Sequence, residues 1–153
     1  MRSAPPTSEL TDHIGYWLRY VSNHVSQAFA RKVEAHGVTV AEWVLMRQLL
    51  NEDAIAPSRL AERMGMTRGA VSKLAERLIA KSMLVREADP NDGRAQTLAL
   101  TRTGRAMVPK LAALADNNDS EFFDHLAPTD RAALLRILRA IVEKRGLKSL
   151  PVD

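Results

Sequence analysis

The chain contains no cysteine, few aromatic residues and no long apolar run, and each absence narrows its possible functions. Without cysteine there is no disulfide scaffold, thiolate metal site, cysteine nucleophile or thiol redox sensor. Aromatic residues make up 5% of the 153 residues, which is few for a protein that stacks RNA bases. No apolar run approaches the roughly 18 residues of a membrane span, and the N-terminus shows no apolar signal segment. We therefore expect a cytoplasmic protein.

Motifs of common enzymes are missing as well. The chain has no phosphate-binding loop, no G-x-G-x-x-G, no G-x-S-x-G and no H-E-x-x-H. The acidic residues are scattered and no pair evidently converges. The four histidines are also dispersed, and His13 and His24 lie three helical turns apart, too far to share one ion without other ligands. We expect no catalytic residue, no metal and no cofactor.

What the chain does have is a concentrated basic segment. Hydrophobic residues are 46% and charged residues 26%, as in an ordinary globular domain, so we expect a single domain over residues 1–153. Between Pro57 and Arg105 there are ten Lys or Arg and five Asp or Glu, so this third of the chain has a net charge of about +5 and the rest of about −1. Such a segment favours a polyanion partner; the alternative is a solvated basic face.

Apolar spacing and capping residues predict six helices. Their expected bounds are Leu10 to about Gly37, Thr39 to Leu50, Pro57 to Gly65, Arg68 to about Lys81, Thr101 through Phe122, and Pro128 to Gly146. Thr39 and Glu42 form a capping-box pattern, and Thr67 and Thr101 are also suited to cap helices.

A two-stranded hairpin is predicted between the fourth and fifth helices. Its strands are expected at Met83–Ala88 and Ala95–Leu100, around the turn signal at residues 89–94. Leu98 and Leu100 alternate with Thr97 and Ala99, a pattern typical of a half-buried strand.

The third and fourth helices carry a helix–turn–helix pattern. Ala61 is small where the next helix crosses, Gly65 permits a positive φ in the tight turn, and Val71 and Leu74 fill the angle between the helices. Such a pair presents its second helix to the DNA major groove; the alternative is a helical hairpin with no nucleic-acid role. The hairpin that follows, with Arg94 at its tip, completes a winged helix–turn–helix, and Arg94 is suited to a narrow minor groove.

These features give a set of candidate DNA-binding residues. The outward face of the fourth helix and its N-terminal turn supply most of them, and in the wing Asp92 is expected to hold the Arg94 guanidinium or to brace the turn. The candidates are Ser58, Thr67, Arg68, Gly69, Ser72, Lys73, Arg77, Asp92 and Arg94.

In its helix–turn–helix and wing, the sequence resembles the MarR family of bacterial transcription regulators. The resemblance rests on the segment at 60–67, Val71-Ser72, the D-P-x-D-x-R wing at 89–94 and the L-x-L-T-x-x-G exit at 98–104, although Asn91 stands where the wing often has arginine. It implies a mainly α fold with a small β-hairpin wing. The winged helix–turn–helix occupies 39–104, and N- and C-terminal dimerisation helices occupy 10–36 and 105–146.

The resemblance further implies a homodimer on a pseudo-palindromic double-stranded DNA operator, and often release of that DNA by a small aromatic, phenolic or anionic ligand. The aliphatic first and last helices also favour a dimer, although a monomer of this size could bury them against itself. Two recognition helices about one DNA turn apart, ~34 Å, would multiply specificity.

For the ligand, a polar–aromatic stripe on the first helix is the candidate. His13, Trp17, Tyr20 and His24 recur at helical spacing, and with Trp43 they are candidates to line a cavity; such stripes are more often core packing. Arg77 and Arg86 match basic ligand contacts of the family, and are equally suited to phosphate.

The prediction is therefore a DNA-binding transcriptional repressor controlled by a small ligand. The alternative is a winged-helix module that binds protein and not DNA. The basic residues of the segment argue against it, because interface cores are usually depleted in lysine.

Overall fold

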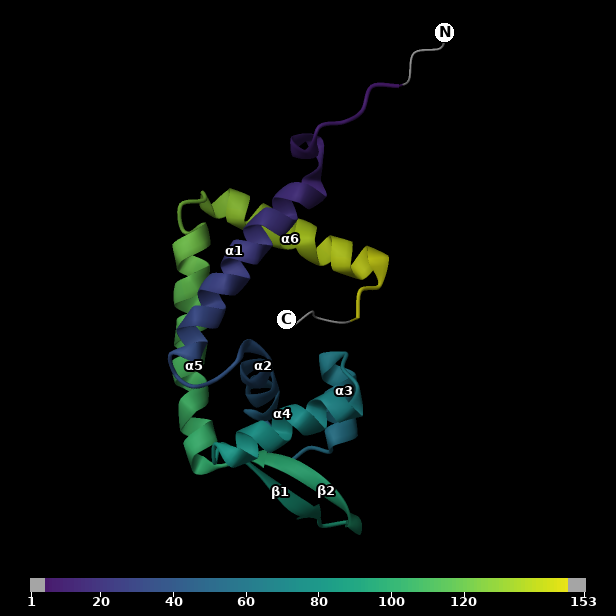
Figure 1. Ribbon diagram of the computed structural model, residues 1–153, viewed down its shortest axis with the longest axis vertical. Helices are drawn as coiled ribbons and strands as arrows, with labels where there is room; N and C mark the ends of the chain where they lie inside the picture. Colours follow the sequence, from purple (N-terminus) through teal and green to yellow (C-terminus); the bar gives the residue numbers. More distant parts are fainter. Residues whose placement is uncertain (1–4, 149–153) are drawn as a thin grey trace.

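The structure, a computed structural model, describes residues 5–148 and consists of six helices with one β-hairpin (Figure 1). Within that range none of the helices is both long and apolar enough to span a bilayer. The elements in chain order are a short 3-10 turn at Leu10–Asp12, α1 Ile14–Glu34, α2 Val40–Leu49, α3 Pro57–Met64, α4 Arg68–Ala80, β1 Leu84–Asp89, β2 Asp92–Leu100, α5 Arg102–Phe123 and α6 Pro128–Arg145.

The hydrophobic core lies at one end of the molecule. It is formed by α2, α3, α4, the base of the hairpin, the last turns of α1 and the first half of α5 (Figure 1). Its largest fully buried side chains include Leu45, Met46, Leu60, Leu78, Leu98 and Leu111. Because the core draws residues from helices α1 to α5 and from both strands, it fixes the winged-helix region as one body.

The predicted helix caps are confirmed at three threonines. Thr39, Thr67 and Thr101 each accept, through the side-chain oxygen, the backbone N–H three residues later, at 3.0–3.1 Å. The capping box predicted for Thr39 and Glu42 is only half formed. The Glu42 carboxylate is turned into the protein, where it binds Lys81, and so does not return to the Thr39 backbone.

The hairpin is longer than predicted. Its strands extend to Asp89 and from Asp92, so only Pro90 and Asn91 separate them, and Leu84 pairs with Leu100 at the base. The expected alternation of buried and exposed residues at the end of β2 is wrong, because residues 97–100 are all buried. Helices α2, α3 and α5 pack around this part of β2, and Ile55 adds a short antiparallel bridge to Leu98.

The junction between hairpin and α5 explains the glycine in the exit motif. A Cβ at Gly104 would lie 2.1 Å from the Met83 carbonyl oxygen, so no larger residue fits without a backbone shift. The same corner is tied by the Thr101 hydroxyl, which donates to the Ser82 carbonyl at 2.6 Å, while Ser82 has a left-handed φ of 62°. The corner fixes where the wing leaves the body.

The first helix starts later than predicted. It begins at Ile14, after the 3-10 turn, because His13 is extended and its Nδ1 lies 3.0 Å from the Glu9 carbonyl. Farther along, α1 packs against α5. The buried Asn118 amide donates to the Val25 carbonyl and its oxygen accepts from Lys32.

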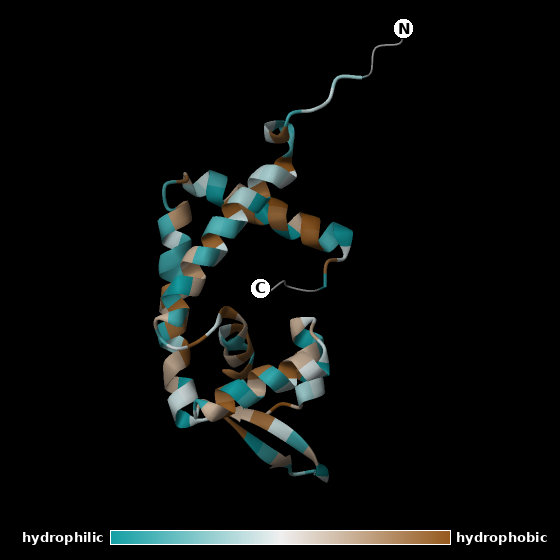
Figure 2. Ribbon diagram, in the orientation of Figure 1, coloured by the Kyte–Doolittle hydropathy of each residue, from teal (hydrophilic) through white to brown (hydrophobic). Residues whose placement is uncertain are grey.

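The end of the molecule away from the wing has a different character. None of the residues of α6 is buried, and six large apolar side chains on it are 37–50% exposed. Figure 2 shows the apolar residues of α6 as brown bands along a helix that leaves the rest of the molecule. The first half of α1 adds Ile14, Trp17, Leu18 and Val21, all exposed. This end of the molecule therefore exposes large apolar side chains from both α1 and α6.

Candidate nucleic-acid interface

The helix–turn–helix forms as the sequence predicts. Gly65 ends α3 with a left-handed φ of 63°, and the Met66 N–H donates to the Ala61 carbonyl at 3.0 Å. Val71 and Leu74 of α4 are buried in the angle between the helices. Packing of these apolar residues leaves the opposite side of α4 free.

That opposite side carries the predicted residues. Arg68, Gly69, Lys73 and Arg77 are exposed on α4, and Ser72 is partly exposed. The first turn of α4 also presents unpaired backbone N–H groups, and the helix dipole makes this end positive. A helix start flanked by cations is suited to an anionic phosphate, and a row of exposed donors along one face is suited to base edges.

Two other predicted residues have different surroundings. Ser58 is exposed in the first turn of α3. The Thr67 hydroxyl oxygen accepts from the Ala70 N–H, so its first role is to start α4.

The wing tip is held by its own carboxylates. Asp92 Oδ1 accepts the Arg94 backbone N–H at 3.0 Å, and Asp89 Oδ1 accepts the Asn91 N–H at 2.9 Å. Within residues 5–148 no ion pair joins Asp92 to the Arg94 guanidinium, so Asp92 braces the turn and does not hold the side chain. Arg94 itself is exposed at the tip.

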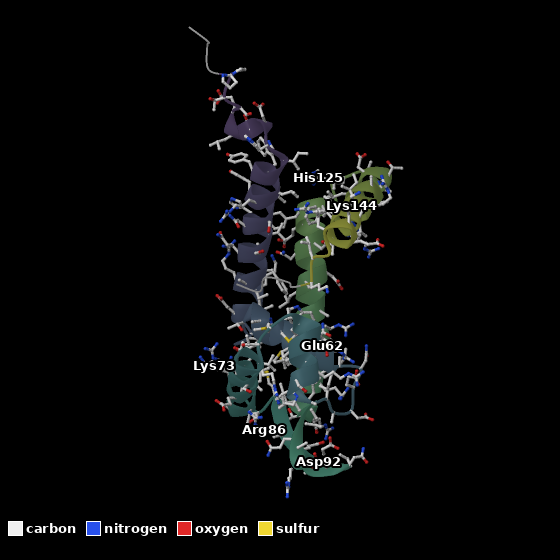
Figure 3. All side chains as sticks on the ribbon, turned by 90° about the vertical axis from the view of Figure 1, so that its right-hand side faces the viewer. Glu62, Lys73, Arg86, Asp92, His125 and Lys144 are labelled. Carbon is white, nitrogen blue, oxygen red and sulfur yellow. The ribbon has the colours of Figure 1, made fainter. Side chains whose placement is uncertain are left out.

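The reading helix and the wing lie at the same end of the molecule. Figure 3 shows Lys73 of α4 with Arg86 and Asp92 of the wing at one end, and His125 and Lys144 at the other. The cations of α4 and the wing are therefore grouped on one region of the surface, as a duplex partner requires.

A buried ion pair that the sequence did not predict holds α4 at its C-terminal end. Glu42 is 1% exposed, and both of its carboxylate oxygens accept from Lys81 Nζ, at 2.7 and 3.0 Å. Lys81 caps α4, so the pair ties the end of the reading helix to α2. The two residues are 39 positions apart, and no local pattern indicates such a contact.

A groove of about 760 Å³ lies between α1, α2 and α4. Its walls are the polar face of α1, the start of α2 and one side of α4; the lining residues are Ser22, Asn23, Ser26, Gln27, Phe29, Ala30, Glu34, Thr39, Val40, Ala41, Leu74 and Arg77. The volume is in the range of small-molecule sites. The α1 residues of this groove were not predicted from the sequence, although their spacing places them on one face of the helix.

Of the predicted ligand residues, Arg77 alone lines this groove. Trp17 and Tyr20 are half exposed on the first half of α1, where Tyr20 stacks on His24 with ring centroids 5.1 Å apart. The Trp17 indole N–H donates to the Thr11 carbonyl at 3.0 Å. Trp43 is buried in the core and Arg86 lies on the wing, so the structure does not bring this set together. The stripe of the first helix is therefore exposed in the described chain and not part of the core, and its residues do not line this groove.

Helix–turn–helix, wing and grouped cations together define a winged-helix DNA-binding protein. The sequence model described as the MarR family matches residues 36–95, which span the helix–turn–helix and most of the wing. A Thauera aromatica protein assigned as the transcriptional regulatory protein for the hcr operon is 24% identical over 149 residues, covering 92% of this chain and 90% of its own.

Solved structures show the same fold. One, titled for the regulation of DNA binding of Bordetella bronchiseptica BpsR by 6-hydroxynicotinic acid, has a TM-score of 0.77 at 24% identity, over 89% of this chain and 97% of its own. A MarR mutant from Escherichia coli complexed with operator DNA has a TM-score of 0.77 at 20% identity, over 89% and 99%.

Residues 36–95 thus match the MarR family, the described chain has the fold of solved MarR-family structures, and the relatives it matches are named as transcriptional regulators. These similarities favour DNA binding over the alternative of a winged-helix module that binds protein and not DNA.

Proposed function

We propose that this protein is a homodimeric repressor that binds a pseudo-palindromic operator and leaves it when a small ligand enters the α1–α2–α4 groove. The observation that carries the proposal is the group of exposed cations on α4 and the wing, beside a groove that α4 itself helps to line.

The DNA contacts follow from position and chemistry. Arg68, Ser72 and Lys73 face outward on α4 and reach base edges or neighbouring phosphates. Arg77, near the end of the helix, contacts the backbone, while Ser58 and the first-turn N–H groups of α4 supply further phosphate donors. Arg94 enters the minor groove from the wing tip, which Asp92 stabilises.

The dimer follows from the apolar surface at the other end. An amphipathic helix forms stably only when its apolar face is covered, and α6 has six large apolar side chains with none buried. A second copy would cover them and would also place two reading helices on one face of the duplex. The dimer would then bind two operator half-sites whose centres lie one DNA turn, ~34 Å, apart.

Ligand control follows from the place of the groove. Leu74 and Arg77 of α4 form one wall and α1 forms another, so a bound molecule contacts the reading helix and the helix expected in the dimer. A ligand that prefers one arrangement of these helices shifts the protein toward it. The similar fold of Bordetella bronchiseptica BpsR, whose DNA binding is regulated by 6-hydroxynicotinic acid, supports this kind of control.

The test of the DNA interface is a matched pair of arginine variants. Arg94→Ala is expected to lower operator affinity by about 1–3 kcal/mol if Arg94 reads bases, or to reduce the salt slope by about one if it meets only phosphate. Arg139→Ala removes the same charge from exposed α6 and is expected to change neither. Fluorescence anisotropy with an operator selected from random duplexes measures both quantities.

Salt dependence gives the second readout. Wild-type affinity for the selected duplex is expected to fall steeply between about 50 and 200 mM salt, because bound cations release counterions. If Arg94→Ala changes neither affinity nor slope, the wing does not contact DNA and the proposed interface is wrong.

A further inference from the structure

The groove between α1, α2 and α4 contains one charge of each sign. Glu34 lies at the C-terminal end of α1 and Arg77 in the last turn of α4, and both line the groove. Neither takes part in any ion pair within residues 5–148, and other carboxylates and cations are absent from the lining. The two charges therefore face a shared space without neutralising each other.

The rest of the lining is uncharged and combines apolar and polar side chains. Phe29, Val40 and Leu74 are apolar, and Ser22, Asn23, Ser26 and Gln27 line one helix face with hydroxyl and amide groups. Arginine pairs with a carboxylate through two parallel N–H donors, and a carboxylate such as Glu34 pairs with an ammonium group. A molecule that fits all of these groups has an apolar middle and opposite charges on its two ends.

We propose that the ligand of this groove is zwitterionic, an amino carboxylic acid whose carboxylate binds Arg77 and whose ammonium group binds Glu34. The inference rests on the proposed ligand control and specifies the charge of the ligand. A purely anionic ligand would pair with Arg77 but would have no cation for Glu34. A second negative charge near Glu34 would be repelled, and an apolar group there would remove water from the Glu34 carboxylate.

The experiment uses matched sets of small molecules on the full-length protein without DNA. One set is rigid: para-(aminomethyl)benzoate, para-methylbenzoate and para-methylbenzylamine. The other is flexible: ε-aminocaproate, hexanoate and hexylamine. Within each set only the charged end groups differ. The distance between the ammonium and carboxylate groups differs between the two sets, so a mismatch of that distance in one set does not decide the result.

Calorimetry and thermal shift measure binding, because a ligand of the folded state alone raises Tm. The zwitterion of at least one set is expected to bind about twofold to fivefold more tightly than its acid and its amine, the range for exposed ion pairs. Higher salt is expected to reduce this preference.

Two substitutions assign the ends. Glu34→Gln is expected to remove the preference for the zwitterion over the acid, and Arg77→Gln the preference over the amine. Glu143→Gln and Arg139→Gln make the same changes on α6, outside the groove, and are expected to leave binding unchanged. Because all four positions are exposed, the variants are expected to fold.

The proposal is overturned if, in both sets, the zwitterion binds no more tightly than the acid, or if Glu34→Gln leaves its preference intact. It is also overturned if no probe of either set binds. Binding of the acids alone would leave ligand control standing and remove only the zwitterion, while the arginine variants on the wing and α6 test DNA binding independently.

Discussion

The two ends of this molecule are built on opposite principles. At the wing end, side chains from five helices and both strands are buried in one core, and cations are exposed on the outer surface. At the other end, α6 and the first half of α1 carry large apolar residues on their surface and bury none of them. The wing end buries its apolar residues within the single chain, while the far end leaves its apolar residues exposed (Figure 2).

The contrast also separates two kinds of specificity. A charged, rigid end is suited to a duplex, because exposed cations must be held in a fixed arrangement to meet phosphates and bases. An apolar end is suited to a protein partner, because the hydrophobic effect that favours its burial is non-directional and needs no individual hydrogen bonds. Substitutions at the two ends are therefore expected to affect different measurements.

The largest effect is expected from breaking the apolar end. Ile137→Glu places a charge in the middle of the exposed apolar face of α6, and burying that charge opposes dimerisation. A monomer presents one half-site reader, so operator affinity is expected to fall toward the non-specific level, by about a thousandfold or more. Sedimentation velocity measures the dimer and fluorescence anisotropy the DNA affinity.

Ala132→Glu is the control for that variant. Ala132 is exposed on the side of α6 that also carries Arg139, away from Ile137, so the added charge stays in water. If sedimentation shows that the Ile137→Glu variant is still a dimer, α6 is not the contact surface.

The next effect compares the two ends for stability. In the monomeric Ile137→Glu background, Leu78→Ala removes a fully buried side chain and is expected to cost about 2–5 kcal/mol of unfolding free energy. Leu138→Ala, on α6, is expected to cost less than about 1 kcal/mol there, because Leu138 is 38% exposed in the single chain. Urea unfolding followed by circular dichroism measures both.

Equal losses for the two leucine variants would mean that α6 packs on its own chain in solution. The contrast between the two ends would then disappear.

The smallest effect concerns the ion pair beneath the reading helix. Glu42→Gln removes the charge that binds Lys81 but keeps the size of the side chain. Since Lys81 is 37% exposed, the expected cost is at the low end for a charged hydrogen bond, about 1–2 kcal/mol. Operator affinity is expected to fall with it, because α4 loses its tie to α2.

Glu62→Gln is the matched control, because Glu62 is exposed on α3, and its expected change in the free energy of unfolding is within about 0.5 kcal/mol. If Glu42→Gln behaves like Glu62→Gln, the pair does not position α4.

Local signals in the sequence predicted most of the winged-helix end. Threonine caps, the glycine in the turn and apolar spacing act between near neighbours, and the structure confirms Thr67, Gly65 and Thr101 in these roles. The errors arose where distant residues decide the outcome. The carboxylate of Glu42 leaves its local cap for Lys81, and Thr97 and Ala99 are buried because three helices surround the base of β2.

The candidate ligand site divides in the same way. The aromatic stripe of α1 is real as a pattern, since Tyr20 and His24 stack, but its residues do not line the groove between the helices. The groove instead uses the polar face of the same helix. Periodicity assigns residues to one face of a helix but does not say what that face packs against.

By itself the sequence determined the number and order of the helices, the turn and the wing, and the residues that carry the positive charge. These depend on backbone preferences and on periodicities that reach only a few positions along the chain. Tertiary structure alone decided which face of α1 borders a groove, that Glu34 and Arg77 line it without an ion pair in the described chain, and that none of the residues of α6 is buried there. The reason is physical: burial and charge pairing depend on which distant elements meet, and that is settled only when the whole chain packs.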